Sequence, residues 1–391
     1  METVKRLLKN NIRQYAMLIA LVVVTLIFQI TTGGIMLMPL NITNIILQNS
    51  HIIILAIGML FVIVGGDFDL SVGSLAGLVG AIVGTLAVTM KLDPILAILI
   101  GLGVGVLAGA WQGMWIAYFR VPAFVVTLGG SMVFRGLMLM LLSSKSIGPF
   151  PDMITSLSSG FIPNLGGAGA LKWSSVAIGV VLAILYVLLE IRKRQKQKRF
   201  GLMTEVVGSG LFVLQIAVVS VVIIAICTVL AQYEGIPNVL VVLVVLLLIF
   251  SFVGNRTVIG RRIYALGGNE RAAALSGINT RKTKFLIFVN MGLMSAVAGI
   301  IFAARLKYAT PQAGEGFELD AIAACYIGGA SSSGGIGTLL GALVGALVMG
   351  VLNNGMSILG FGVDVQQVIK GLVLIFAVLF DVMTKSKAGG Q

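Results

Sequence analysis

The most basic stretch of the chain, residues 260–284, contains six Lys or Arg residues but only one acid, Glu270. It lies between two apolar segments, in a chain where only 10% of residues are charged. A basic and partly helical loop at a membrane surface suits docking onto an aqueous partner, or alternatively a connector that rests on lipid headgroups. The chemistry that this stretch predicts is therefore recognition and not covalent catalysis.

A second polar stretch, GGDFDLSVGS at residues 65–74, interrupts two apolar runs. Carboxylates at membrane depth are costly unless they face water or protein, so we predict that Asp67, Phe68, Asp69 and Ser71 line a translocation pathway. The flanking glycines allow a broken helix, whose freed backbone groups could border that pathway. The alternative is that Asp67 or Asp69 caps the helix that begins near Ser71.

Two later segments place aromatic, amide and cationic side chains inside apolar sequence: Trp111 and Gln112 in one, Phe134 and Arg135 in the other. We predict that these four residues belong to the same pathway. A cation within an apolar run needs a partner, and we predict that Arg135 pairs with one of the two aspartates of residues 65–74. The alternative is that Arg135 reaches toward the membrane boundary.

Asn353 and Asn354, in VLNNGM, complete the predicted pathway and echo AWQGM at residues 110–114. A looser pair is FDLSVG at 68–73 and FELDAI at 317–322, in the same order along the chain. Two such echoes suggest an old internal duplication. Amides, carboxylates and aromatic rings suit a neutral polyhydroxylated solute, because amides and carboxylates hydrogen-bond hydroxyls while rings cover C–H faces.

The residue types that catalysis and metal binding need are scarce. His51 is the only histidine, so hydrolase or zinc chemistry would rest on one ring, and we expect this ring to be structural. Cys227 and Cys325 lie inside apolar runs without metal-ligand spacing. The sequence also lacks the G-x-x-x-x-G-K-[ST] phosphate loop. We therefore predict neither an enzyme nor a resident cofactor or metal.

Composition requires a membrane around these polar groups. Apolar residues make up 58% of the chain, which has a mean hydropathy of +1.07 and 50 glycines. Runs of about 20 apolar residues can cross the hydrocarbon core as helices. We predict an all-α polytopic membrane protein that forms a single domain over residues 1–391. Its twelve predicted spans are 14–33, 50–66, 71–90, 94–118, 123–142, 173–190, 206–231, 238–253, 285–303, 321–334, 337–358 and 365–383.

The positions of the cations predict the orientation. Of 27 Lys and Arg residues, 20 fall on one face of this topology, and the positive-inside bias makes that face cytoplasmic, with both termini on it. The net charge of +13 therefore reflects topology and contact with anionic lipids, and does not indicate nucleic-acid binding. The short segment 321–334 leaves an alternative: if it turns back as a re-entrant half-helix, the C-terminus lies outside. We expect 14–33 to remain as an uncleaved helix, because no clear cleavage site follows it.

Four motifs carry a resemblance to a known family. They are GGNERAAALSGI in the basic loop, GGDFDLSVGSLAGL, VPAFVVTLGGSMVFRGL and LDAIAACYIGGASSSGGIGTLLGALVGA. Together they resemble the membrane permease subunits of bacterial ABC importers for monosaccharides, the ribose, xylose and galactose group, over nearly the whole chain. Residues 145–205, an additional outer loop and helical hairpin, resemble the longer xylose and multiple-monosaccharide members.

This resemblance implies that residues 261–284 form a cytoplasmic coupling loop, whose helix docks on a separate ATPase subunit that binds ATP and Mg²⁺. An acid near the helix N-terminus, small residues that leave a narrow face, and two apolar anchors fit that role. It also implies a second permease copy, giving a homodimer, in a bacterial cytoplasmic membrane. The predicted coupling residues are Asn269, Glu270, Arg271, Ala272, Ala273, Leu275, Gly277 and Ile278.

The resemblance further implies a soluble or lipid-anchored sugar-binding protein on the outer face. Charge pairs would guide that encounter, although a solvated loop without a partner is the alternative. The implied function is ATP-driven import of a monosaccharide, either a xylose-like pentose or several aldoses. The rivals are an ion-coupled secondary transporter of a small polar solute, a passive channel and an intramembrane enzyme. The predicted docking residues are Arg305, Lys307, Glu315, Glu318 and Asp320.

Overall fold

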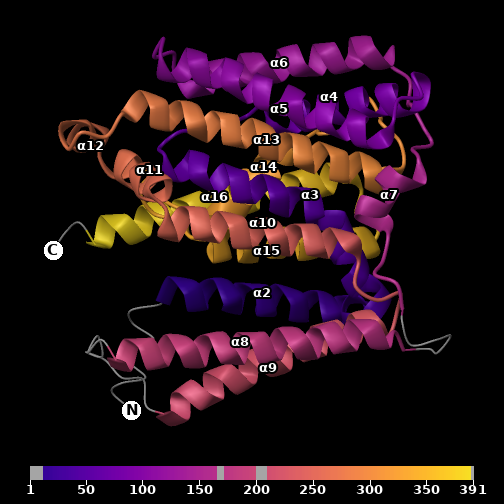
Figure 1. Ribbon diagram of the computed structural model, residues 1–391, viewed down its shortest axis with the longest axis vertical. Coiled ribbons are helices and arrows are strands. Elements are labelled where there is room, and N and C mark those ends of the chain that lie inside the picture. The colour runs from indigo at the N-terminus through magenta and orange to yellow at the C-terminus, as the bar shows by residue number, and fades with distance from the viewer. Residues whose placement is uncertain (1–11, 165–170, 200–208, 389–391) are drawn as a thin grey trace. The chain divides into compact units, whose positions relative to one another are not determined.

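The computed structural model describes residues 12–164, 171–199 and 209–388 (Figure 1). Its regular elements are helices, and the described residues contain no β-strand beyond two isolated bridges, which confirms the all-α prediction. The helices are α2 (Ile12–Thr31), η1 (Ile35–Leu37), α3 (Pro39–Val64), α4 (Val72–Gly84), the π-helical η2 (Thr85–Thr89), α5 (Pro94–Ala117), α6 (Ala123–Leu142), α7 (Asp152–Ser159), α8 (Trp173–Arg199), α9 (Ser209–Ala231), α10 (Asn238–Arg256), α11 (Val258–Gly268), α12 (Glu270–Leu275), α13 (Thr280–Leu306), α14 (Phe317–Ile327), α15 (Leu339–Ile358) and α16 (Val363–Ala388).

Ten helices among the described residues are long and apolar enough to cross a bilayer, and a shorter apolar helix covers Met17–Thr31. Large apolar side chains are exposed along α2, α9, α10 and α16. Water would disfavour such surfaces, whereas lipid accommodates them. Each of the twelve predicted spans overlaps a helix in the described residues; the span predicted at 206–231 begins outside them, at 206–208, and the span predicted at 321–334 continues past the end of α14.

The chain divides into two compact units, and the predicted single domain over residues 1–391 stays a prediction. The additional segment predicted at 145–205, whose residues 165–170 and 200–205 lie outside the described residues, overlaps unit 2, which continues through α9. Within unit 2, α8 packs on α9, and the Ile236 N–H donates to Ser175 Oγ at 3.0 Å. Unit 1 comprises Met1–Met36, Ile45–Ser159 and Val239–Gln391, and unit 2 comprises Leu37–Asn44 and Gly160–Asn238. All predicted site residues therefore lie in unit 1.

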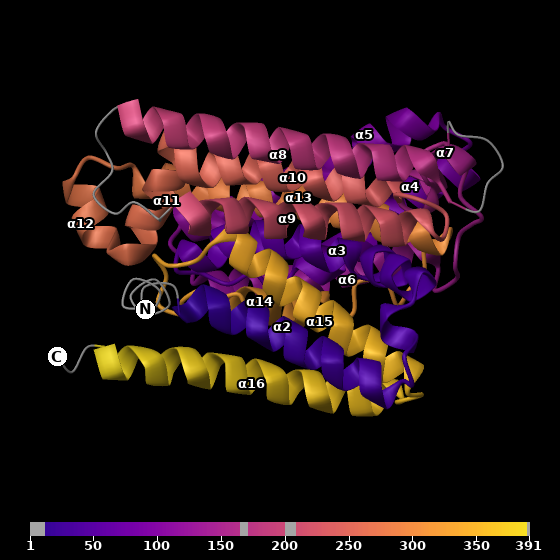
Figure 2. The ribbon, with the colours of Figure 1, turned by 90° about the horizontal axis from the view of Figure 1, so that it is seen from below.

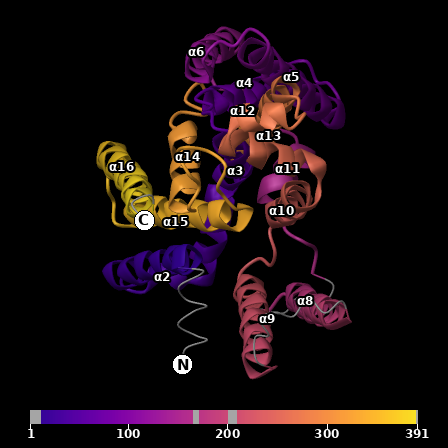
Figure 3. The same ribbon diagram turned by 90° about the vertical axis from the view of Figure 1, so that its left-hand side faces the viewer.

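Figure 3 views unit 1 from the end that carries α12. Helices α4, α5, α6 and α13 lie together on one side, α2, α15 and α16 lie on the other, and α3 and α14 lie between them. α2 packs along α15 (Figures 1 and 2). The described start of α2 and the end of α16 lie at the same end as α12, and α7 lies at the opposite end (Figure 1). We call these the α12 end and the α7 end of unit 1.

Glycines allow α5 and α13 to pack at close range in unit 1. A Cβ added at Gly292 would meet the carbonyl oxygen of Gly105, and one added at Gly109 would meet the carbonyl oxygen of Phe288. Membrane helices associate through such small residues, because lipid tails are as apolar as the helix surfaces. The close approach of α5 to α13 fixes the positions of the polar residues that both helices carry.

The segment that contains α14 crosses unit 1 and does not turn back. The Cys325 thiol points to the carbonyl oxygen of Ala56 at 3.5 Å. Further along, the Gly335 N–H donates to the carbonyl oxygen of Val64, the last residue of α3, at 2.9 Å. The segment therefore runs beside α3 toward the α12 end. This course favours a crossing at 321–334 over the re-entrant alternative.

Candidate functional site

Local hydrogen bonds define α12 as a short separate helix at the α12 end. Asn269 Oδ1 accepts the N–H of Ala272 at 2.9 Å and so caps the first turn. Gly277 follows the helix with a φ of +82°, a left-handed conformation that favours glycine. Asn279 Oδ1 then accepts the N–H of Lys282 at 2.9 Å and begins α13. The predicted basic loop is therefore two ordered helices, α11 and α12, joined to α13.

The outer surface of α12 carries an apolar side chain in an otherwise polar setting. Leu275 is 91% exposed, the highest value among the large hydrophobic residues described. Ala273 is buried and Ile278 is half-buried, so these two predicted coupling residues hold the segment in place. The other predicted coupling residues are exposed. Leu275 is thus the one predicted anchor that faces fully outward.

Lys284 of α13 links α12 to the segment 65–71. Its Nζ lies 3.2 Å from Asp67 Oδ2 and 3.4 Å from Glu270 Oε2. Burial raises the pKa of the Asp67 carboxyl above its ordinary value, and the neighbouring cation only partly opposes this effect. Lys284 therefore connects α12 to the segment between α3 and α4 through two ion pairs.

An open cavity of about 730 Å³ borders these groups at the α12 end. Four cations line it against two acids, Asp67 and Glu270. The α5–α6 turn supplies one cation, and α12 and α13 supply the others. The excess of positive charge suits contact with an acidic surface. The four cations are Arg120, Arg271, Arg281 and Lys284.

The segment 65–71 breaks the chain between α3 and α4, as predicted for a broken helix. Asp69 Oδ1 accepts the N–H of Ser71 at 2.9 Å and its Oγ–H at 2.7 Å. Gln112 Nε2 of α5 donates to Ser71 Oγ at 2.7 Å. Asp69 thus accepts hydrogen bonds from Ser71, the residue before α4, and not from an N–H of the first turn of α4. The capping alternative therefore holds only in the sense that Asp69 fixes the N-cap residue Ser71. The three residues form one buried polar cluster.

The remaining aromatic pathway residues flank these elements. The rings of Trp111 and Phe134 meet edge to face, with 6.1 Å between their centroids, so α5 and α6 bring together two predicted residues. Phe68 instead lies near Tyr326, at 6.4 Å between ring centroids. Aromatic contacts of this kind add to the packing of the helices that carry them.

The predicted pairing of Arg135 with Asp67 or Asp69 is wrong. Arg135 Nη1 donates to the carbonyl oxygen of Ala313 at 3.0 Å, and Nη2 lies 3.7 Å from Glu315 Oε2. The reason is the direction of α6, which starts at the α12 end and carries its guanidinium away from both aspartates. The cation is instead neutralised by the loop that precedes α14.

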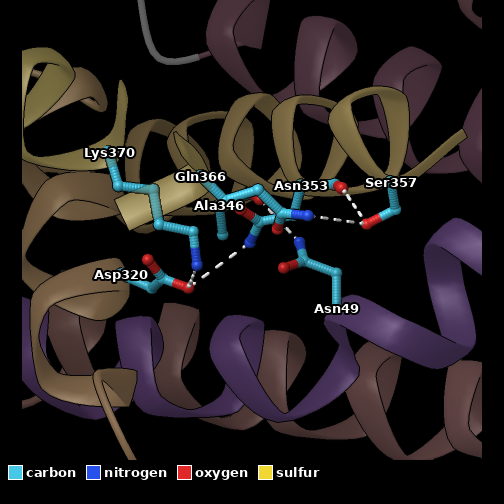
Figure 4. Close-up of polar contacts among 7 residues, drawn as sticks. All are labelled: Asn49, Asp320, Ala346, Asn353, Ser357, Gln366 and Lys370. Carbon is cyan, nitrogen blue, oxygen red and sulfur yellow. Dashed lines mark hydrogen bonds and ion pairs between the residues drawn. The ribbon is translucent and has the colours of Figure 1, made fainter. Parts of the chain in front are cut away.

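A second cavity, of about 270 Å³, lies toward the α7 end of unit 1. Asn353 and Lys370 point toward Asp320, whose Oδ2 accepts from Lys370 Nζ at 2.9 Å and from Asn353 Nδ2 at 3.3 Å (Figure 4). Side chains of α3, α13, α14, α15 and α16 border this space. We call it the polar cavity, and its polar lining includes Gln48, Asn49, His51, Arg305, Glu315, Asp320, Asn353, Gln366 and Lys370.

Three acceptor atoms in the polar cavity have no hydrogen-bond partner among the described residues. They are His51 Nδ1, Asp320 Oδ1 and Asn353 Oδ1. The side chains of His51 and Asp320 are only 6% and 5% exposed. Buried polar atoms are normally satisfied, so three unsatisfied acceptors around one cavity indicate a place for hydrogen-bond donors from a ligand or from water.

The structure divides the predicted docking residues between two settings. Arg305, Glu315 and Asp320 border the polar cavity, although they are predicted to face a binding protein. Glu318 is half-buried at the start of α14, while Lys307 is exposed just beyond α13. Docking at Lys307 and Glu315, which are both exposed, stays a prediction.

Several residues of the polar cavity are missed by the sequence reasoning. Gln48 and Asn49 lie in α3, which begins at Pro39 and so extends the predicted span toward the N-terminus. Lys370 and Gln366 lie in α16. The available signal was the presence of amide and cationic side chains within helical apolar sequence. Asn354, by contrast, is a predicted pathway residue, and its Nδ2 donates to Gln48 Oε1 at 3.4 Å.

Comparison with known proteins places this architecture among transport permeases. Residues 41–378 match the family described as the permease component of branched-chain amino acid transport systems. No solved structure matches the chain.

Curated relatives extend over most of the chain. The xylose transport system permease protein XylH of Haemophilus influenzae is 38% identical over 377 residues, which cover 96% of this chain and 98% of the relative. The protein of the same name in Escherichia coli is 37% identical over 382 residues, which cover 97% of this chain and 94% of the relative. The ribose import permease protein RbsC of Bacillus subtilis is 35% identical over 343 residues, which cover 88% of this chain and 85% of the relative.

Proposed function

The chain belongs to the family of permease components of branched-chain amino acid transport systems, and from that premise we propose that it is the membrane-spanning subunit of an ATP-driven monosaccharide importer. Its relatives are named as permeases for xylose and ribose, which supports a pentose or a related aldose as the solute. The polar cavity supports the same choice, because amide, carboxylate and imidazole groups suit hydroxyls better than an aliphatic side chain.

The observation that carries the proposal is the construction of α12. Leu275 stands 91% exposed on a capped helix, and Lys284 bridges Glu270 of that helix to Asp67. An exposed apolar anchor beside a cationic cavity suits docking on another protein. We assign this partner as a separate ATPase subunit, which would bind ATP and Mg²⁺ and would place the α12 end, with both termini, in the cytoplasm of a bacterium.

Two further partners complete the proposed system. A sugar-binding protein would dock at the α7 end, where Lys307 and Glu315 are exposed. A second copy of the permease would supply the other half of the pathway. Closure of the ATPase subunits would then move α12, and the access of the pathway would switch between the two sides.

Copurification with the ATPase subunit tests the docking assignment. We expect Leu275→Ala to lower the amount of bound ATPase at least several-fold, because the apolar anchor of the contact is lost. The matched control is Leu306→Ala at the opposite end of unit 1, which should bind as the parent does. Equal binding by the parent and Leu275→Ala would remove α12 as the docking element.

Uptake measurements test the solute class and the energy source. The complete system should accumulate radiolabelled D-xylose or D-ribose but not L-leucine, and accumulation should persist when ion gradients are collapsed while ATP is maintained. Accumulation of L-leucine alone would replace the sugar assignment. Loss of uptake with the ion gradient would favour the ion-coupled alternative.

A further inference from the structure

The polar cavity contains three buried polar atoms that have no hydrogen-bond partner among the described residues. Its three unpartnered atoms, on His51, Asp320 and Asn353, are all able to accept hydrogen bonds and come from three different helices. An ordinary buried network would pair these atoms with one another or with the backbone. In the described part of the chain, Asp320 instead uses only Oδ2, for Lys370 and Asn353 (Figure 4).

Aromatic rings line the same space. The ring centroid of His51 lies 4.3 Å from that of Phe317 and 4.9 Å from that of Phe302. Phe302 and Phe317 meet edge to face, also at 4.9 Å. The cavity therefore offers apolar ring surface beside hydrogen-bond acceptors, the combination that a sugar ring with C–H faces and equatorial hydroxyls requires.

The charges of the cavity favour a neutral ligand. Two cations, Arg305 and Lys370, and two acids, Glu315 and Asp320, line it, so its formal charges balance, and Lys370 is paired directly with Asp320. The unsatisfied groups need donors, which a carboxylate or phosphate lacks. The volume of about 270 Å³ suits one small ring rather than a disaccharide.

From these observations we propose that the polar cavity is a solute-binding station for a single neutral polyhydroxylated ring, held by hydroxyl donation to His51 Nδ1, Asp320 Oδ1 and Asn353 Oδ1. The imidazole accepts through Nδ1 when its proton resides on Nε2. The station rests on the proposed function and deepens it, because it makes the permease itself select for hydroxyls after a binding protein has delivered the solute.

Protection of an introduced cysteine tests this station in the full chain with its ATPase subunit. Gln366→Cys places a thiol on the wall of the cavity, at a half-buried position. Both native cysteines are buried, so a methanethiosulfonate reagent reports on position 366. We expect D-xylose or D-ribose to slow the labelling in a concentration-dependent manner, and L-leucine to leave it unchanged.

Two volume-conserving variants in that background remove single acceptors. His51→Phe keeps an aromatic ring against Phe302 and Phe317, and Asn353→Leu keeps the size of the side chain. Each should raise the sugar concentration for half-protection at least tenfold, while labelling without sugar stays at the parent rate and shows that the fold is intact. Asn255→Leu, an exposed change at the end of α10, is the matched control and should protect as the parent does.

The outcomes separate the station from the proposed function. If uptake is specific for a sugar but this sugar protects both variants at the parent concentration, or fails to protect the parent, the station is overturned. If uptake and protection are instead specific for L-leucine, both proposals fall. If neither sugar is taken up, the proposed function fails first.

Discussion

Two polar clusters of unit 1, around Lys284 and around Asp320, differ in how completely their groups are paired. At the α12 end, Lys284 of α13 forms ion pairs with both Asp67 and Glu270, and so links α12 to the segment between α3 and α4. Toward the α7 end, Asp320 binds Lys370 through one oxygen while its second oxygen is unsatisfied. The cluster around Lys284 suits transmission of movement, because its ion pairs join α12 directly to the segment between α3 and α4. The incompletely paired cluster suits a ligand that comes and goes.

Removal of the bridging cation should have the largest effect. Lys284→Met leaves Asp67, which is only 16% exposed, beside Glu270 without its cation. Loss of a buried partner costs about 3 kcal/mol, and solvent at the exposed Glu270 reduces this cost, so we expect a fall in ATP-driven uptake of about tenfold. Transport in proteoliposomes measures it.

The matched control for this prediction is Lys282→Met, which removes an exposed lysine two residues earlier in α13. It should transport within about twofold of the parent, because exposed charges contribute little. A similar fall in both variants would mean that charge at the α12 end matters only in sum, and the bridge would lose its special role.

A smaller effect is expected from the cation of the polar cavity. Lys370→Met removes the partner of Asp320 Oδ2 but leaves the amide of Asn353 to donate to it. We expect the KM for sugar uptake to rise about fivefold, because ligand hydroxyls meet a displaced carboxylate. An unchanged KM together with a lower rate would indicate that the pair serves movement, as at the α12 end, and the contrast between the clusters would disappear.

Acidification should affect the α12 end still more modestly. Burial raises the pKa of Asp67, so its carboxylate takes up a proton at a higher pH in the folded chain than in the unfolded chain. The contribution of Asp67 to the free energy of unfolding therefore grows as the pH falls, so protonation does not destabilise the fold. Protonation does weaken the ion pair between Asp67 and Lys284. Uptake should decline as the pH on the α12 side falls through this raised pKa. Asp67→Asn should flatten the dependence of uptake on pH. A parent profile identical to that of Asp67→Asn would contradict this origin.

The smallest expected change concerns the cap of α12. Asn269→Ala removes the acceptor for the Ala272 N–H and should destabilise the helix locally by about 1 kcal/mol. Hydrogen exchange at α12 should rise while the rest of unit 1 exchanges as before. Asn269→Asp, which can still accept this bond, is the control, and equal exchange in all three chains would show that the cap does not hold α12.

Helix positions could be predicted from the sequence because apolar runs of sufficient length leave the chain little choice in a bilayer. The helix in residues 261–284 was predicted from the family resemblance, while the cap at Asn269 and the turn at Gly277 come from the structure. The early start of α3 at Pro39 was missed, because Gln48 and Asn49 give that stretch the composition of a loop. Their helical placement follows from tertiary packing, which periodicity does not report.

The partners of charged residues were harder to predict than the helices. Arg135 and the aspartates of residues 65–74 belong to neighbouring parts of the sequence. The course of α6 nevertheless brings the Arg135 guanidinium to Ala313 and Glu315. Asp320 was assigned to an outer loop, although its helix dips inward to meet Asn353 and Lys370. Pairing across helices depends on depth and rotation, and a linear sequence states neither.

The internal echoes acquire a structural counterpart. Ser71 in FDLSVG accepts from Gln112 of α5, and Asp320 in FELDAI accepts from Asn353 of α15. In each case a residue near the start of a short helix meets an amide on the next long helix. α4 runs away from the α12 end whereas α14 runs toward it, so if the chain arose by the predicted duplication, its two halves are inverted. The proposed station uses only the second arrangement.

We propose that ATP hydrolysed on a separate subunit drives solute through this chain by way of α12. The most direct test is the ratio of internal to external D-xylose and D-ribose in proteoliposomes that contain the permease with or without its ATPase subunit and binding protein. We predict a ratio well above one only for the complete system with ATP, and a return to one in Lys284→Met. A ratio above one for the permease alone, driven by an ion gradient, would contradict the account.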